Sequence, residues 1–337
     1  MTTFADGLFQ YGGMPVGVVA PIPRAAIGGR VYFVDGSNGS DAYNGKSVKR
    51  PFATIQAAVT AADAGDTVFV FPKAMAAGAT DPGSYEENVV IPATAENLAI
   101  IGVSYGRTQG GLPQLKVGTT TTQALLTVRA PGCLIANLGI NGSGATGGGI
   151  LLDDDGSTKT AFGTSIVGCH LKNCKGTTAT DAATGGAIQF SGAPWQLLIK
   201  GNRFYNNVGD VVLLNTSNSA PKDIVIEDNI FSDDPAASDV NVYLAGGSGV
   251  ASGLIIRNNV FGALPALTSG ALKRFFNLTG CTGMFVGNVV GAVANVTGTE
   301  LTYTTAGTGG YLPATVFMAN NWGQSGTSGE VGYLAHT

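Results

Sequence analysis

Three aspartates recur at comparable places in the chain and are the residues best suited to acid–base chemistry. Asp181, Asp210 and Asp239 each lie roughly ten residues after a short motif that the chain repeats. Glycoside hydrolysis uses a pair of carboxyl groups, one as general acid and the other as base or nucleophile. If successive repeats stack, small differences in loop length bring these side chains together, and they become the candidate set of a polysaccharide hydrolase or lyase.

The surroundings of these aspartates argue against catalysis. No cluster of His, Tyr, Trp or Arg accompanies them in sequence to hold a sugar, and Trp195 and Tyr205 are the candidates for exposed aromatic side chains. The denser acidic runs at 153–155 and 233–234 are typical of strand exits and turns, where consecutive side chains point in different directions. The sequence therefore predicts no catalytic residue, and the three aspartates are kept for the enzymatic alternative only.

Composition narrows the class of protein. The chain has 337 residues, 51 of them Gly, with 12% charged residues and a formal charge of −4. A nucleic-acid-binding surface is usually basic, so this charge argues against that class. No window approaches the 18 uninterrupted apolar residues of a membrane span, and the first residues lack the pattern of a secretory signal. Many glycines with few charges favour a fold of short strands and tight turns.

The cysteines and histidines predict neither a metal site nor a cofactor. Cys133, Cys169, Cys174 and Cys281 have no metal-binding spacing, and the chain has two histidines. Four cysteines in a chain of this length do not form a disulfide scaffold. We therefore expect free, buried thiols, with no metal and no cofactor bound.

The repeated motif is the strongest signal in the sequence. "LIKGNRF", "VIEDNIF" and "LIIRNNVF" share an Asn followed two residues later by Phe, and the motif returns about every thirty residues. A period of this length marks a solenoid, propeller or array. Helical spacing and propeller signatures are absent, so the pattern predicts a β-solenoid of about 8–9 coils. Its anchor positions are Gly102, Asn137, Cys169, Asn202, Asn229, Asn259, Asn288 and Asn320.

Stacked coils place equivalent residues ~4.8 Å apart, so like side chains form columns. The anchor predicts an amide ladder of Asn202, Asn229, Asn259, Asn288 and Asn320. Two residues later, the pattern predicts a buried core stack of Phe204, Phe231, Phe261, Val290 and Trp322, whereas the position between them, which includes Asn321, faces outward. Two residues before the anchor, Lys200, Glu227 and Arg257 predict alternating charges on adjacent strands that help to set the register.

A different region precedes the repeats. A short strand over 31–34 and a polar loop lead to "ATIQAAVTAADAG", whose apolar spacing predicts an amphipathic helix over 53–64. Thr54 is suited to the N-cap, and Gly65 supplies the stop. Because a solenoid must cover its first coil, we expect this helix to be a cap.

This opening carries a family resemblance. The residues Val34-Asp35, Gly39-Ser40-Asp41, Gly45, Pro51-Phe52, 54–58 and 65–68 are similar to the opening of pectin-lyase-like right-handed parallel β-helix proteins. The resemblance implies an all-β, right-handed, single-stranded parallel β-helix. The family includes polysaccharide lyases and hydrolases, bacteriophage tailspikes and other virion proteins, so the motif is specific for fold and not for activity.

The resemblance leads to a division of the chain and to three hypotheses for its function. We expect an N-terminal extended attachment arm over 1–29, the opening strand, loop and capping helix over 30–72, coils over 73–325 and a C-terminal tail over 326–337. The first hypothesis is a structural bacteriophage virion protein, assembled in the host cytoplasm as a homotrimer. Such a protein would decorate or cement the capsid or form a short tail spike, and its arm would bind other virion proteins. The alternatives are a tailspike depolymerase acting on host surface polysaccharide and a bacterial surface adhesin. None of these uses involves nucleic acid or membrane insertion.

Overall fold

The computed structural model describes most of the chain between residues 29 and 290 and shorter pieces on either side. The described residues are 9–11, 14–16, 29–79, 83–104, 111–156, 160–178, 182–192, 194–217, 219–232, 240–244, 249–262, 274–290, 310–311, 315–324 and 331–333.

Three long sheets run along the molecule. Sheet I has ten strands: β3 Val31–Val34, β4 Thr67–Val70, β7 Ala99–Gly102, β10 Leu134–Ala136, β13 Ser165–Val167, β16 Leu198–Lys200, β19 Val225–Glu227, β22 Leu254–Arg257, β25 Gly283–Val286 and β28 Val316–Ala319. Sheet II also has ten: β5 Ser84–Glu86, β8 Gln114–Lys116, β11 Gly139–Asn141, β14 His170–Lys172, β17 Arg203–Tyr205, β20 Ile230–Ser232, β23 Val260–Gly262, β26 Val289–Val290, β29 Trp322–Gln324 and β30 Val331–Tyr333. Sheet III has eight: β6 Val89–Ile91, β9 Leu126–Val128, β12 Ile150–Leu152, β15 Ile188–Phe190, β18 Gly209–Leu213, β21 Val240–Tyr243, β24 Arg274–Asn277 and β27 Gly310–Tyr311.

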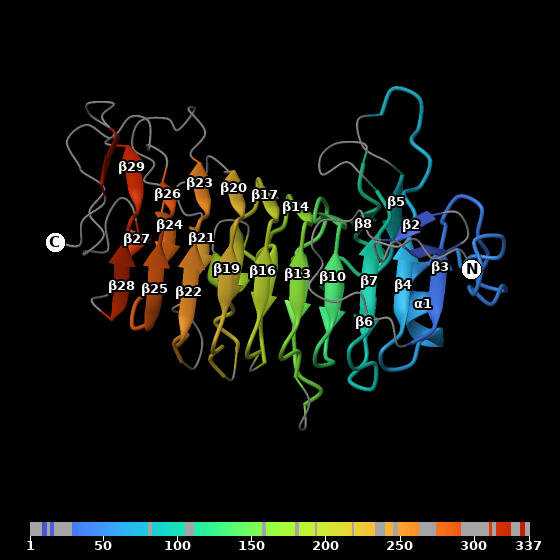
Figure 1. The fold of residues 1–337 in the computed structure, drawn as a ribbon, viewed down its shortest axis with the longest axis horizontal. Coiled ribbons are helices and arrows are strands. Elements are labelled where there is room, and N and C mark those ends of the chain that lie inside the picture. The colour runs from blue at the N-terminus through green and yellow to red at the C-terminus, as the bar shows by residue number, and fades with distance from the viewer. Residues whose placement is uncertain are drawn as a thin grey trace.

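The strand order shows how the chain winds. From β4 to β29, neighbours within a sheet are three strands apart in sequence, as in β16, β19 and β22, and they pair in parallel. Each turn of the chain therefore adds one strand to each sheet, and the coils follow one another along the long axis in chain order (Figure 1). The predicted fold class, an all-β parallel β-helix, is confirmed.

The core is a set of columns inside the coil. Alternate residues of a strand point to opposite faces, so the middle residue of each sheet I strand faces inward. These residues are mainly β-branched, which suits a pleated and buried surface. Nine of the ten are buried, namely Tyr32, Val68, Ile100, Ile135, Ile166, Ile199, Ile226, Ile256 and Phe285, and the tenth, Met318 on the last strand, is partly buried.

The predicted cap is present, in a shorter form than expected. Helix α1 spans Ile55–Ala61, against the expected 53–64, and its apolar face is buried against β3, β4 and β6. The Thr54 side chain accepts a hydrogen bond from the Ala57 amide at 3.2 Å, as an N-cap does. The Glu87 carboxylate accepts from the amides of Ile55 and Gln56, both at 2.8 Å, which ties the cap to a neighbouring coil.

Short strands stand at both ends of the described chain. Strands β1 Phe9–Tyr11 and β2 Met14–Val16 form an antiparallel pair within the expected arm. Strand β30 pairs with β29 in the antiparallel sense, at the end of sheet II. Most of the arm lies outside the described residues, so its use for attachment stays a prediction. Among the described residues, no helix is long and apolar enough to cross a membrane.

Candidate functional site

The repeated motif forms the corner between sheets I and II. From β16 onward, this corner consists of two residues: Gly201–Asn202, Asp228–Asn229, Asn258–Asn259, Gly287–Asn288 and Asn320–Asn321. The first residue of each pair has a φ between +54° and +68°. Gly, Asn and Asp adopt this left-handed conformation more readily than other residues, which explains their use there. The second residue then turns its side chain into the coil.

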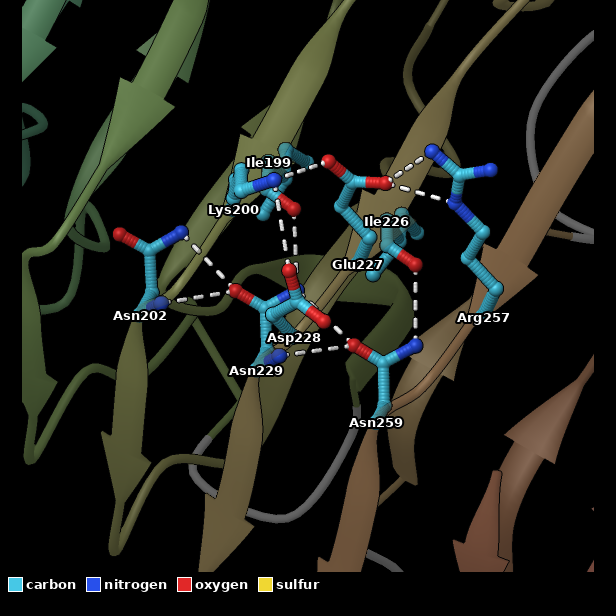
Figure 2. A network of polar contacts seen from close by, with 9 residues as sticks. All are labelled: Ile199, Lys200, Asn202, Ile226, Glu227, Asp228, Asn229, Arg257 and Asn259. Atoms are coloured by element: carbon cyan, nitrogen blue, oxygen red, sulfur yellow. Dashed lines mark hydrogen bonds and ion pairs between the residues drawn. The ribbon is translucent and has the colours of Figure 1, made fainter. Parts of the chain in front are cut away.

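The inward-facing amides form a ladder that runs along the axis, and three of its rungs are drawn in Figure 2. From the second rung on, each Oδ1 accepts the backbone N–H of the preceding rung at 2.9–3.0 Å and its Nδ2 at 3.0–3.1 Å, whereas the Oδ1 of the first rung accepts the Cys169 amide at 2.9 Å. Each Nδ2 also donates to a sheet I carbonyl of the preceding coil at 2.8–3.0 Å. The rungs are Asn202, Asn229, Asn259, Asn288 and Asn321. Buried polar groups are thus paired with one another, and the motif has a structural role.

The predicted ladder is wrong by one residue at its last rung. The ladder contains Asn321, which is buried, whereas Asn320 is the left-handed residue before it. The pair Asn258–Asn259 shows the same order, so two consecutive asparagines leave the register ambiguous in sequence. The same slip affects Asn137, whose φ is +53°. The inward position on that coil is held by Leu138.

The core stack beside the ladder is formed by phenylalanines. The rings of Phe204 and Phe231 stack with centroids 4.8 Å apart, and those of Phe231 and Phe261 with centroids 4.6 Å apart. Val290 continues this column. Trp322 was expected there, but it pairs with Val289 and is 49% exposed, because Asn321 and not Asn320 is the rung. The position aligned with Val290 is Gly323.

A charged cluster lies beside the ladder, on the outer side of sheet I. Lys200 Nζ lies 2.7 Å from one carboxylate oxygen of Glu227 and 3.3 Å from Asp228, and Arg257 Nε donates to the other Glu227 oxygen at 2.6 Å (Figure 2). Burial alone would raise the pKa of Glu227, but the hydrogen bonds from Lys200 and Arg257 hold it below its ordinary value. The cluster is electrically balanced, with two cations and two carboxylates. It ties three coils in register.

Of the three candidate catalytic aspartates, the structure describes one, Asp210. Asp181 and Asp239 lie outside the described residues. Asp210 is buried, and its carboxylate accepts from the amides of Asn207 at 2.9 Å and Asn241 at 2.6 Å. An acid enclosed in this way is placed to hold coils together and is shielded from a polymeric substrate.

The remaining acidic runs are also structural where they are described. Asp153 accepts a hydrogen bond from Arg129 Nε at 3.2 Å, and Asp154 accepts from the Gly156 amide at 2.9 Å within a turn. The run at 233–234 lies outside the described residues.

The four cysteines are buried and free, as the sequence predicts. Burial raises the pKa of each thiol to about 12, so the thiolate that would react or bind a metal is disfavoured. Within the described part of the chain, no three His, Cys, Asp or Glu side chains gather as a metal site would require.

The sequence did not reveal an exposed column on the turn from sheet III to sheet I. Phe162 and Trp195, each 45% exposed, lie beside each other on adjacent coils. Their register is set by equivalent hydrogen bonds, in which the Gly163 amide donates to the Trp195 carbonyl and the Gln196 amide donates to the Lys222 carbonyl. Lys222 follows on the next coil, bridged to Trp195, with its Nζ 5.5 Å from the indole centroid. We call these three residues the aromatic column. In the sequence, Gly163 is the signal that could have revealed Phe162. Gly163 follows Phe162 and has a positive φ, as does Gln196, which follows Trp195 at the same place in the next coil.

The fold and this surface define a parallel β-helix whose described polar groups serve mainly to stack its coils. No protein-family model matches the chain, and no curated protein sequence matches it either. Among solved structures, the chain is similar to a pectin methylesterase from carrot, with a TM-score of 0.48, 14% identity, and 93% of this chain and 89% of that one covered. Escherichia coli YbhC gives a TM-score of 0.48 at 11% identity, with 86% and 84% covered. The Dettilon tailspike protein gives 0.39 at 16%, with 87% and 62% covered. These likenesses concern the path of the backbone and say nothing of activity.

Proposed function

We propose that the chain is a structural protein of a bacteriophage particle, a β-helical shaft that binds other molecules and does not cut them. The observation that carries the proposal is the uninterrupted amide ladder from Asn202 to Asn321. Inward polar groups are used to hold the coils together, and outward side chains stand in straight columns. Such a shaft presents one rigid surface over many coils, which suits adhesion or decoration.

The position of this shaft on the particle is part of the proposal. In keeping with the family resemblance, the proposed shaft is a homotrimer. It docks on other virion proteins through residues 1–29, either on the capsid or at the tail. Gold-labelled antibodies against the protein should bind intact, purified particles at one of these two places. Particles produced without the gene serve as the control. If washed particles carry none of the protein, the proposal is wrong.

The enzymatic alternative is tested with host surface polysaccharide. Purified protein should release no new reducing ends and no unsaturated uronate absorbance above a heat-treated sample. Asp210→Asn is the variant to compare, with its fold checked by circular dichroism because Asp210 is buried. Cleavage by the native protein that Asp210→Asn abolishes without unfolding would overturn the proposed role.

A second candidate function, recognition of a glycan chain, is favoured by the aromatic column. Exposed rings offer apolar faces on which sugar rings can stack, and the ammonium of Lys222 lies beside them. The rings are spaced by one strand separation, ~4.8 Å, along the axis. A column of this kind suits an acidic chain that lies parallel to the shaft.

The fluorescence of Trp195 can report on this candidate. In a Trp322→Phe background, Trp195 is the remaining tryptophan, and oligogalacturonate should quench or shift its emission at concentrations where neutral dextran fragments do not. Lys222→Gln should weaken the effect about tenfold, since a charge-assisted contact contributes about 1.4 kcal/mol or more. Equal responses to both sugars would remove the preference for an acidic chain, and no response to either would remove glycan recognition at this column.

A further inference from the structure

The outer face of sheet II differs in composition from the rest of this acidic chain. Each of its strands turns its middle residue inward and its first and third residues outward. Among the described residues, no outward position from β8 to β26 holds Asp or Glu, although the chain has 22 acidic residues. The face follows one row of strands along the shaft (Figure 1). In a chain with a formal charge of −4, such a face is suited to an anionic partner.

The basic part of this face lies on β14 and β17. His170 and Lys172 point outward from β14, and they pair with Arg203 and Tyr205 on β17. Adjacent positions lie ~4.8 Å apart across the strands and ~6.6 Å apart along them, so the four side chains form one patch. Arg203 is exposed and forms no ion pair with a described residue, whereas the cations beside the ladder are balanced by carboxylates.

The column that contains Arg203 becomes apolar on the following strands. Ile230 is half-buried, and Val260, Val289 and Trp322 are 42%, 46% and 49% exposed. The third positions of β20 and β23 hold small residues, so the apolar side chains project beyond them. From β14 to β29 the column covers five strand spacings, about 24 Å.

The two parts of the face together favour a lipid surface. Lys and Arg side chains close to a bilayer are attracted to anionic headgroups. Aliphatic and aromatic side chains on the same face bury at the boundary between headgroups and acyl chains. A soluble acidic polymer would contact the cations and leave the apolar column in water. An uncharged protein would desolvate Arg203 without supplying an opposite charge.

We infer that the outer face of sheet II, from β14 to β29, is a peripheral docking surface for an anionic lipid bilayer. The shaft lies along the bilayer surface, with the basic patch on the headgroups and the apolar column at the acyl boundary. This inference goes beyond the proposed function, because it uses neither the aromatic column nor residues 1–29. Either of the two can therefore fail while the other holds.

Co-sedimentation of the full chain with vesicles tests the electrostatic part. Binding to phosphatidylglycerol vesicles should be at least tenfold tighter than binding to phosphatidylcholine vesicles, and Arg203→Glu should weaken it at least tenfold. Arg50→Glu makes the same change in net charge on an exposed loop near the other end of the shaft, and should alter binding by less than about twofold because distant charges are screened. No binding by the native protein, or equal losses in the two variants, would overturn the inference.

The fluorescence of Trp322 tests the apolar part. In a Trp195→Phe background, Trp322 is the remaining tryptophan, and phosphatidylglycerol vesicles should shift its emission to the blue. Brominated acyl chains should quench it. Val289→Glu should weaken binding at least tenfold, whereas Val48→Glu, at an exposed valine of the opening loop, should not. If Trp322 emission is unchanged by bound vesicles, the apolar column does not meet the lipid and the inference is wrong.

A soluble acidic polymer is the competing partner. Polyphosphate and oligogalacturonate are the probes, and their binding to the native protein and to Arg203→Glu is measured by calorimetry. A polymer that binds through Arg203 while vesicles do not bind would assign the face to that polymer and overturn the inference. Circular dichroism of each variant confirms that the fold is retained, which is expected because the replaced side chains are exposed.

Discussion

The coils from β16 onward and the two coils before them, which contain β10 and β13, follow the same path and close the same corner with different chemistry. In the later coils, the side chain of an inward Asn such as Asn229 makes four hydrogen bonds to its neighbours. In the earlier coils, Leu138 and Cys169 stand at that position. The Cys169 thiol lies 3.8 Å from the Ile135 carbonyl, which corresponds to the carbonyl that the Asn202 amide bonds on the next coil.

This difference separates what the winding requires from what stabilises it. Both sets of coils place a left-handed residue first, such as Asn137 or Gly168 in the earlier coils and Gly201 in the later ones. The inward residue can be apolar, a thiol or an amide. The left-handed residue therefore makes the corner, and the amide adds hydrogen bonds between coils. We expect the later coils to depend on their columns more strongly than the earlier coils do.

Removal of the central ring of the core stack should have the largest effect. Phe231→Ala leaves a cavity between Phe204 and Phe261 and breaks two stacked contacts, so we expect a loss of about 4–5 kcal/mol in the free energy of unfolding. Leu171 occupies the same position in an earlier coil, and Leu171→Ala should lower the free energy of unfolding by about 3 kcal/mol. Urea denaturation followed by circular dichroism measures both. Equal losses would show that ring stacking adds nothing to burial.

Replacement of a middle rung should come next. Asn229→Ala leaves the amide groups of Asn202 without their acceptor and the Ile199 carbonyl without a donor, and should cost about 3 kcal/mol. Cys169→Ala removes only weak thiol contacts and a small apolar volume, so about 1 kcal/mol is expected.

A leucine at the same rung sharpens the comparison. Asn229→Leu copies the residue that the earlier coil carries as Leu138, and so fills the space without restoring the hydrogen bonds. If the stability of Asn229→Leu in urea equals that of the native protein, the amide ladder contributes nothing beyond volume.

The charged cluster should produce a smaller, pH-dependent effect. The folded-state pKa of Glu227 lies below the unfolded value of about 4.3, so its contribution is present above that value and is lost as pH falls through the folded pKa. Because Arg257 is half exposed, we expect about 1 kcal/mol. Glu227→Gln should lower stability at pH 7 and remove this part of the acid dependence. Thermal unfolding at pH 7 and pH 3 measures it, and an identical difference at both values would exclude the charge as the cause.

The winding and the capping helix could be predicted because each has a local signal. The inward columns recur as a motif, and Thr54 precedes an amphipathic stretch. The last rung could not be placed, since Asn320 and Asn321 both suit the corner and only the pairing of β26 with β29 decides between them. Asp210 is enclosed by Asn207 and by Asn241, which lies on the next coil. The spacing of acidic residues in the sequence does not reveal these contacts, so the burial of Asp210 could not be predicted. Phe162 and Trp195 could not be predicted to be neighbours, because the turn that carries them varies in length between coils and its register is not evident in the sequence.

The smallest effect should come from the residue that makes the corner itself. Gly201 has a φ of +64°, and no atom lies within 4 Å of where its Cβ would stand. Gly201→Asn should change stability by less than about 0.5 kcal/mol, because Asn adopts this conformation at other corners, such as Asn258, and a side chain restricts the unfolded chain. Gly201→Val should cost about 1–2 kcal/mol, because a β-branched side chain is strained there. Urea midpoints of the two variants measure the difference. If valine were tolerated as well as asparagine, the left-handed residue could not be what both sets of coils have in common.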